Sequence, residues 1–188
     1  MSEVKNKNLL NLVLSAMFLA LGIVLPFLTG QIKEIGNMLL PMHFPILLCG
    51  LICGWKYGAV TGFFVPIIRS LIFGMPVLYP NAIGMAFELL TYGLLAGLLF
   101  EKSRWHCIKA LYKTLLITVI SGRIVWAIAQ IFMLGIGDEG FTFAVFLSKG
   151  LINAIPGLIL QFTLIPAIML ILKRTHLIPF KKDNKVTE

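Results

Sequence analysis

The chain has 188 residues, of which 59% are apolar and 13% are charged, and its mean hydropathy is +0.94. Because a soluble domain is about half apolar and about a quarter charged, this composition excludes an ordinary soluble protein. A formal net charge of +8 would indicate a nucleic-acid partner in a soluble protein, whereas in a membrane protein it is typical of basic cytoplasmic loops, so no nucleic-acid partner is predicted.

Apolar runs long enough to cross a bilayer recur along the whole chain. Crossing about 30 Å of hydrocarbon takes about 20 helical residues, and open strands would leave backbone groups unpaired in lipid. We therefore predict an all-α polytopic membrane protein that forms one integral-membrane domain over residues 1–188. The six expected transmembrane helices cover residues 9–28, 38–54, 57–74, 80–100, 110–134 and 147–172, and a basic tail follows at 173–188.

The lysines and arginines indicate how these spans are oriented. Basic residues gather in cytoplasmic loops, and placing both termini in the cytoplasm leaves only Lys33 in the outer loops. The cytoplasmic segments then hold Lys5, Lys7, Lys56, Lys102, Arg104, Lys109, Lys113, Lys173, Arg174, Lys181, Lys182 and Lys185. This asymmetry predicts that the N-terminus and the C-terminus are both cytoplasmic.

Small residues recur four positions apart in the first four expected helices. Such spacing lets helix backbones approach closely in lipid, where packing replaces the hydrophobic effect. The residues concerned are Ala16 and Ala20 in the first helix, Gly50, Gly54, Gly58 and Gly62 in the second and third, and Gly93 and Gly97 in the fourth.

Apart from Lys113 at the cytoplasmic end of the fifth span, four charged side chains fall within the expected spans: Arg69, Glu88, Arg123 and Lys149. Each costs about 2.5–3.5 kcal/mol at the centre of a membrane helix, so each should face the bundle interior or water and have a partner. Two interpretations stay open at this point. The charges can surround a ligand, or Glu88 and Arg123 can form an ion pair that only fixes the packing.

Helical spacing adds uncharged polar residues to this set. Asn81, Glu88 and Tyr92 share one face of the fourth helix, and similar stripes run along the fifth and sixth helices. A mostly apolar pocket with a few convergent polar groups is typical of a small-molecule site, and three cations against one carboxylate favour an anionic ligand. The candidate binding residues are Asn81, Glu88, Tyr92, Arg123, Trp126, Gln130, Lys149, Asn153, Arg69 and His43, the last being either part of the pocket mouth or a packing residue.

Several familiar chemistries have no motif in this sequence. It contains no G-x-x-x-x-G-K-[ST] phosphate loop and no H-E-x-x-H, G-x-S-x-G or C-x-x-C motif. Its histidines, His43, His106 and His176, are expected on both sides of the membrane, so they cannot form one metal site. We predict no enzymatic activity, no cofactor and no metal, and an external source of energy if the protein moves a solute.

Three stretches resemble the substrate-binding S component of an energy-coupling factor (ECF) vitamin transporter. Ala16-Met17-Phe18-Leu19-Ala20 matches the A-x-x-x-A motif of that family, and the glycine-rich run 37–62 is similar to the family as well. The stretch 69–76, Arg-Ser-Leu-Ile-Phe-Gly-Met-Pro, resembles the pantothenate-transporting subgroup. The resemblance covers essentially the whole chain.

This resemblance implies a bacterial plasma-membrane protein that captures a small vitamin outside the cell. Its partners would be a transmembrane coupling protein, which docks on Ala16 and Ala20, and two ATPase subunits that supply the energy. Pantothenate, or another small anionic vitamin, is the implied substrate. The alternative from a different class is a stand-alone secondary carrier or channel in which the buried Glu88 serves as the proton or cation site.

Overall fold

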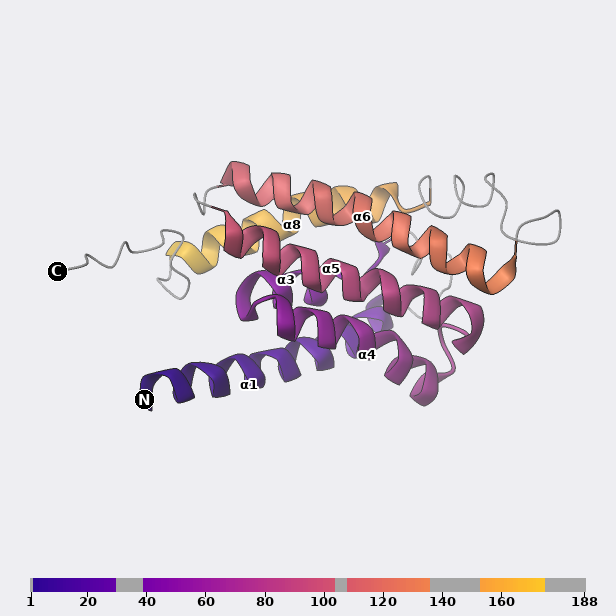
Figure 1. Cartoon of the computed structure of the whole chain (residues 1–188), viewed down its shortest axis with the longest axis horizontal. Coiled ribbons are helices and arrows are strands. Elements are labelled where there is room, and N and C mark those ends of the chain that lie inside the picture. The colour runs from indigo at the N-terminus through magenta and orange to yellow at the C-terminus, as the bar shows by residue number, and fades with distance from the viewer. Residues whose placement is uncertain (1, 30–38, 104–107, 136–152, 175–188) are drawn as a thin grey trace.

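The computed structural model describes residues 2–29, 39–103, 108–135 and 153–174, and the regular structure in these ranges is all helical, as predicted (Figure 1). The helices in chain order are α1 (Ser2–Val24), η1 (Leu25–Thr29), α3 (His43–Cys53), α4 (Trp55–Phe73), η2 (Leu78–Ala82), α5 (Ile83–Lys102), α6 (Ile108–Leu134) and α8 (Ile155–Arg174).

Five helical segments of the described chain are long and apolar enough to cross a membrane. They are Asn8–Phe27, Trp55–Phe73, Leu78–Lys102, Ile108–Leu134 and Ile155–Leu172. The second expected span, 38–54, corresponds instead to the 11-residue helix α3, which is only about 16 Å long and too short to cross about 30 Å of hydrocarbon alone. The structure therefore supports a polytopic helical membrane protein, while the number of six spans and the side of the termini stay predictions.

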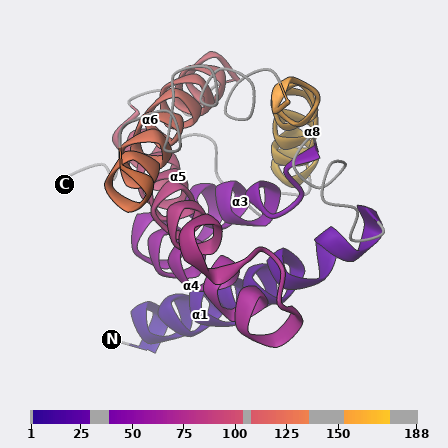
Figure 2. The same cartoon turned by 90° about the vertical axis from the view of Figure 1, so that its right-hand side faces the viewer.

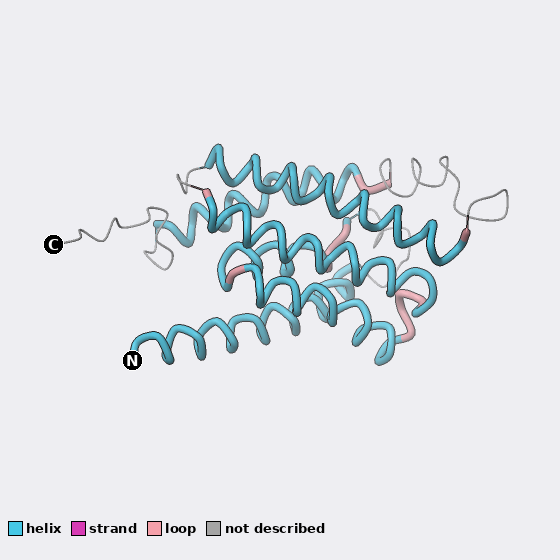
Figure 3. Tube along the Cα trace, in the orientation of Figure 1, coloured by secondary structure: helices cyan, strands magenta, loops and turns pink. Residues whose placement is uncertain are grey.

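The long helices run side by side along one axis, as in a transmembrane bundle (Figure 3). Viewed along that axis, α3, α5, α6 and α8 form a ring, and α4 and α1 are stacked on one side of it (Figure 2). The apolar core includes residues from all four helices of the ring, among them Ile46, Leu89, Leu115 and Ile165. The helix α3 is buried along nearly its whole length, which agrees with its apolar sequence on every side.

Glycines hold α3, α4 and α5 in backbone contact. A Cβ atom added to Gly93 would collide with the backbone of Gly58, and one added to Gly50 would lie 2.5 Å from the carbonyl oxygen of Gly93. Similarly, Gly62 faces the backbone of Leu89. These contacts confirm the close packing predicted from the glycine spacing.

Gly54 has a different role from the one that the spacing predicted. It is the single residue between α3 and α4, its φ angle is +96°, and a Cβ atom there would meet nothing within 4 Å. A positive φ favours glycine because other residues clash with their own backbone. Gly54 therefore ends one helix and begins the next, and its expected part in two packing pairs was wrong.

Candidate functional site

The polar faces predicted for the fourth and fifth spans lie against each other, because α5 and α6 pack side by side. Near one end of this contact, the amide of Gln130 lies against Gly84, with Nε2 2.8 Å from the position of a Cβ on that glycine. Further along, the ring of Tyr92 covers Gly122 and occupies the space of a side chain there. Glycine on one helix thus makes room for a polar side chain from the other.

Between these two contacts, three helices bring charged or titratable groups together. Glu88 Oε1 of α5 lies 3.1 Å from Arg123 Nη1 of α6 and 3.5 Å from His43 Nε2 of α3. The ring of Tyr92 packs edge-on against His43, with centroids 5.1 Å apart. The side chains of His43, Glu88 and Arg123 are 1%, 2% and 9% exposed, so the cluster is shielded from its surroundings. A buried carboxylate of this kind is tolerated because it is paired.

Several buried polar atoms have no hydrogen-bond partner within the part of the chain that the structure describes. They belong to side chains of the four ring helices only, α3, α5, α6 and α8. The atoms are His43 Nδ1, Tyr92 Oη, Thr118 Oγ1, Arg123 Nε and Nη2, Gln130 Nε2, and Gln161 Nε2 and Oε1. A buried polar group left unpaired costs about 1–3 kcal/mol, and among the described residues these atoms are concentrated on one side of the molecule.

Three buried polar side chains on α1 and α4, those of Ser15, Thr61 and Arg69, are by contrast bonded within the protein. Ser15 Oγ donates to the carbonyl of Leu12 at 2.8 Å, and the thiol of Cys49 donates to Thr61 Oγ1 at 3.7 Å. None of the described side chains on α1 or α4 has a buried unpartnered polar atom. The molecule is thus divided into a packed half and a half with unused hydrogen-bonding capacity.

Arg69, predicted as a binding residue, lies in the packed half. Its Nη1 donates to the carbonyl oxygen of Ile23 at 2.5 Å, and its guanidinium carbon lies 5.0 Å from the ring of Phe27 and 5.6 Å from that of Phe73. The last carbonyls of a helix have no partner within the helix, and Ile23 is in the last turn of α1. The structure therefore places Arg69 as a cap of α1, next to a pair of aromatic rings that contact each other.

Replacing Arg69 by methionine is expected to lower the thermal midpoint of the purified protein and leave ligand affinity unchanged. The variant leaves the partly buried carbonyl of Ile23 without its donor, at a cost of up to about 1–3 kcal/mol. The thermal midpoint of Arg69→Lys, which keeps the charge but loses the planar guanidinium, should lie between those of the wild type and of Arg69→Met. A normal thermal midpoint together with weakened ligand binding would indicate that Arg69 belongs to the ligand site.

The remaining predicted residues are placed less centrally. Asn81 is half-buried in η2, which precedes α5, and Trp126 is half-buried on α6 one turn after Arg123. Asn153 is exposed just before α8, and Lys149 lies outside the described residues. The sequence predicts three cations and one carboxylate in one site. In the described part of the chain, Arg123 is paired with Glu88 and Arg69 bonds to the end of α1, so this surplus of positive charge is absent there.

Two polar residues in the ring were missed by the sequence analysis. Gln161 on α8 is 1% exposed and Thr118 on α6 is fully buried. Gln161 is the only amide in the apolar run Ile155–Leu172, whose one other hydrogen-bonding side chain is Thr163, and a lone amide of this kind is a signal like that of the intramembrane charges. It was overlooked because only charged residues and their helical neighbours were followed.

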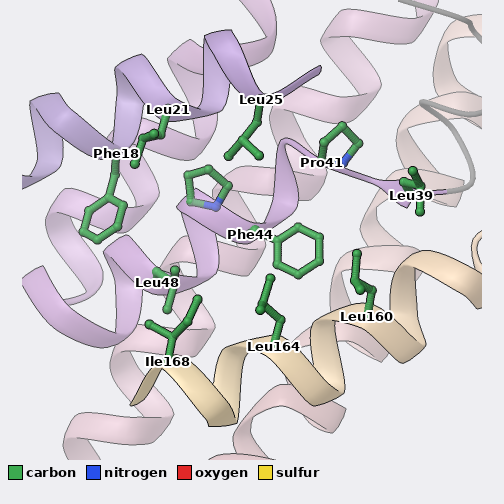
Figure 4. A pocket seen from close by; sticks show the side chains of 11 residues that line it. Phe18, Leu21, Leu25, Leu39, Pro41, Phe44, Leu48, Leu160, Leu164 and Ile168 are labelled. Atoms are coloured by element: carbon green, nitrogen blue, oxygen red, sulfur yellow. The ribbon is translucent and has the colours of Figure 1, made fainter. Parts of the chain in front are cut away.

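An apolar cavity of about 420 Å³ lies next to the ring, between α1, α3 and α8 (Figure 4). None of the predicted binding residues within the described ranges lines it. Its walls are Phe18, Leu21, Leu25, Leu39, Pro41, Phe44, Pro45, Leu48, Leu160, Leu164 and Ile168. The described residues that line it include no charged or hydrogen-bonding side chain to orient a polar molecule, so this lining does not match the polar pocket expected from the sequence.

Comparison with known proteins gives one result. The model of a family described as "ECF transporter, substrate-specific component" matches residues 10–169. No curated protein and no solved structure matches the chain.

Proposed function

Because the chain belongs to the family of ECF transporter substrate-specific components, we propose that it is the high-affinity subunit that captures pantothenate, or another small vitamin, outside the cell. Family membership makes it the substrate-specific component of an importer, with transport rather than catalysis as its activity. In the proposed arrangement, six spans with both termini in the cytoplasm cross a bacterial plasma membrane. A transmembrane coupling protein and two ATPases then complete the ECF importer.

The observation that supports a capture site is the set of unpartnered polar atoms in the ring of α3, α5, α6 and α8. Arg123 pairs with Glu88 through Nη1 and keeps Nε and Nη2 free of partners among the described residues. These N–H groups suit a carboxylate, which accepts charge-assisted hydrogen bonds from a guanidinium. With the N-terminus inside, the beginning of α5 faces outward, and Glu88 lies five residues after Ile83, which puts the site in the outer half of the bundle.

The proposed pocket includes further predicted residues at its rim and centre. His43 and Tyr92 belong to the cluster around Glu88. Gln130 lies toward the outer end of α6, beyond Arg123. Asn81, Trp126, Lys149 and Asn153 complete the proposed binding set.

The first helix supplies the proposed docking surface. Ala16 and Ala20 are exposed on α1, whereas Phe18 on the opposite face is buried in the core. Val13 and Val24, on the same side as the alanines, are 59% and 56% exposed. An apolar helix face with small residues at its centre fits close packing against a second membrane helix, and a coupling protein is the partner that we propose there.

Mass spectrometry of the small molecules that co-purify with the detergent-solubilised chain tests the capture function. We expect pantothenate, or another vitamin, in stoichiometric amount. Liposomes that contain only this chain should show no uptake. Uptake driven by an ion gradient, without ATPase partners, would instead support the secondary carrier that uses Glu88.

A further inference from the structure

Gln161 is a buried amide in the apolar run Ile155–Leu172, where Thr163 is the only other residue with a hydrogen-bonding side chain. Its side chain is 1% exposed, and Gly157, Ile165 and Met169, which share its face of α8, are buried too. The side chain therefore points into the ring, where Ile165 and Met169 belong to the common apolar core. Thr163, two residues further on, is exposed, and its hydroxyl donates to the carbonyls of its own helix at 3.0 Å.

Both polar atoms of the Gln161 amide, Nε2 and Oε1, have no partner within the described protein. Since both are unpartnered, the argument does not depend on which way the amide is turned. A group that satisfies this amide must accept a hydrogen bond from Nε2 and donate one to Oε1. An amide or a hydroxyl does both, whereas an ionised carboxylate can only accept.

The free atoms of Arg123 have the opposite character, because a guanidinium can only donate. In the view along the bundle, α8 lies across the ring from α5, whose Glu88 holds Arg123 (Figure 2). Arg123 and Gln161 therefore suit different chemical groups. The first suits an acceptor-only group, and the second suits a neutral group that donates and accepts.

Resting on the proposed capture function, we infer that Gln161 is a specificity-determining residue of the substrate site. It recognises an amide or hydroxyl of the ligand while Arg123 binds the acidic end. The substrate class is then a small organic acid that carries a neutral hydrogen-bonding group at a distance from its carboxylate. A simple fatty acid of similar length lacks this second group, and a buried polar group left unpaired by the wrong ligand is a strong basis for rejection.

The test compares Gln161→Met with the wild-type chain, and uses Thr163→Val on the exposed side of the same helix as control. The probes are pantothenate and octanoate, titrated by calorimetry in detergent. Wild type should bind pantothenate far more tightly than octanoate. Gln161→Met should lose about tenfold or more in pantothenate affinity and discriminate less between the two acids, and Thr163→Val should change neither value.

Stability without ligand gives a second readout. A methionine has a similar length and removes an unpaired amide, so the thermal midpoint of the ligand-free variant should stay the same or rise. A lower midpoint would show that the protein itself satisfies this amide, which overturns the inference. Unchanged pantothenate affinity in Gln161→Met would overturn it too, with the capture function intact. Failure of the wild-type chain to bind pantothenate would overturn the proposed substrate itself.

Discussion

Replacing Arg123 by leucine is expected to destabilise the protein strongly and to abolish tight vitamin binding. The change leaves Glu88, which is 2% exposed, without the guanidinium 3.1 Å away. Removing one partner of a buried ion pair costs about 3–5 kcal/mol, because the remaining charge has no compensation. Thermal unfolding and calorimetric titration of the same detergent preparation measure both effects.

A double variant, Arg123→Leu with Glu88→Leu, separates pairing from binding. It removes both charges, so much of the lost stability should return, because a buried pair can be replaced by apolar residues at little net cost. Binding should not return, because Arg123 Nε and Nη2 are needed for the ligand; their loss corresponds to about 1.5–3 kcal/mol. If the stable double variant binds as tightly as wild type, the ion pair is purely structural and the candidate site lies elsewhere.

Tryptophan at Ala16 or Ala20 is expected to stop uptake while vitamin binding stays normal. Both alanines are exposed on α1 and face away from the core, so the larger side chain has room in the isolated subunit. A coupling helix packed against the small residues would be pushed away by several ångströms. ATP-dependent uptake in cells or in liposomes with the complete transporter should fall to background, and calorimetry on the isolated subunit should give the wild-type affinity.

Ile120→Trp is the matched control for this second prediction. Ile120 is 53% exposed on α6, which lies on the opposite side of the molecule from α1 (Figure 1). A tryptophan there should leave both uptake and binding intact. Equal loss of binding and uptake in the Ala16 variant would contradict a docking role and would indicate a folding defect instead.

The helical class and the facing of α5 and α6 could be predicted from sequence because both follow from periodicity. Residues such as Glu88 and Tyr92, four apart, share a helix face whatever surrounds the helix. Costly polar residues must also turn inward in lipid. The short helix α3 was less predictable, since apolar content alone does not reveal where a helix starts. Likewise, the spacing of Gly54 suits either a packing pair or a turn, and only its positive φ distinguishes the two.

Glu88 and Arg123 could be named in advance as one possible ion pair, but the partner of Arg69 could not be predicted, because sequence gives the depth of a residue but not which helix end lies beside it. Arg69 and Arg123 looked equivalent as intramembrane cations. The fold places Arg69 at the end of α1 and Arg123 against α5. The charges that were counted together along the chain therefore do not lie in one site. Gln161 and Thr118 were missed for a related reason. A neutral polar residue stands out as a candidate only when the structure shows that its side chain is buried.

The central claim is that the unpartnered polar atoms of α3, α5, α6 and α8 are satisfied by a captured nutrient. Titrating pantothenate into the purified, ligand-free chain by calorimetry, without any other subunit, tests it most directly. We predict saturable binding of one molecule per chain, accompanied by a higher thermal midpoint. Absence of saturable binding by this chain alone, for pantothenate and for any molecule that co-purifies with it, would contradict the claim.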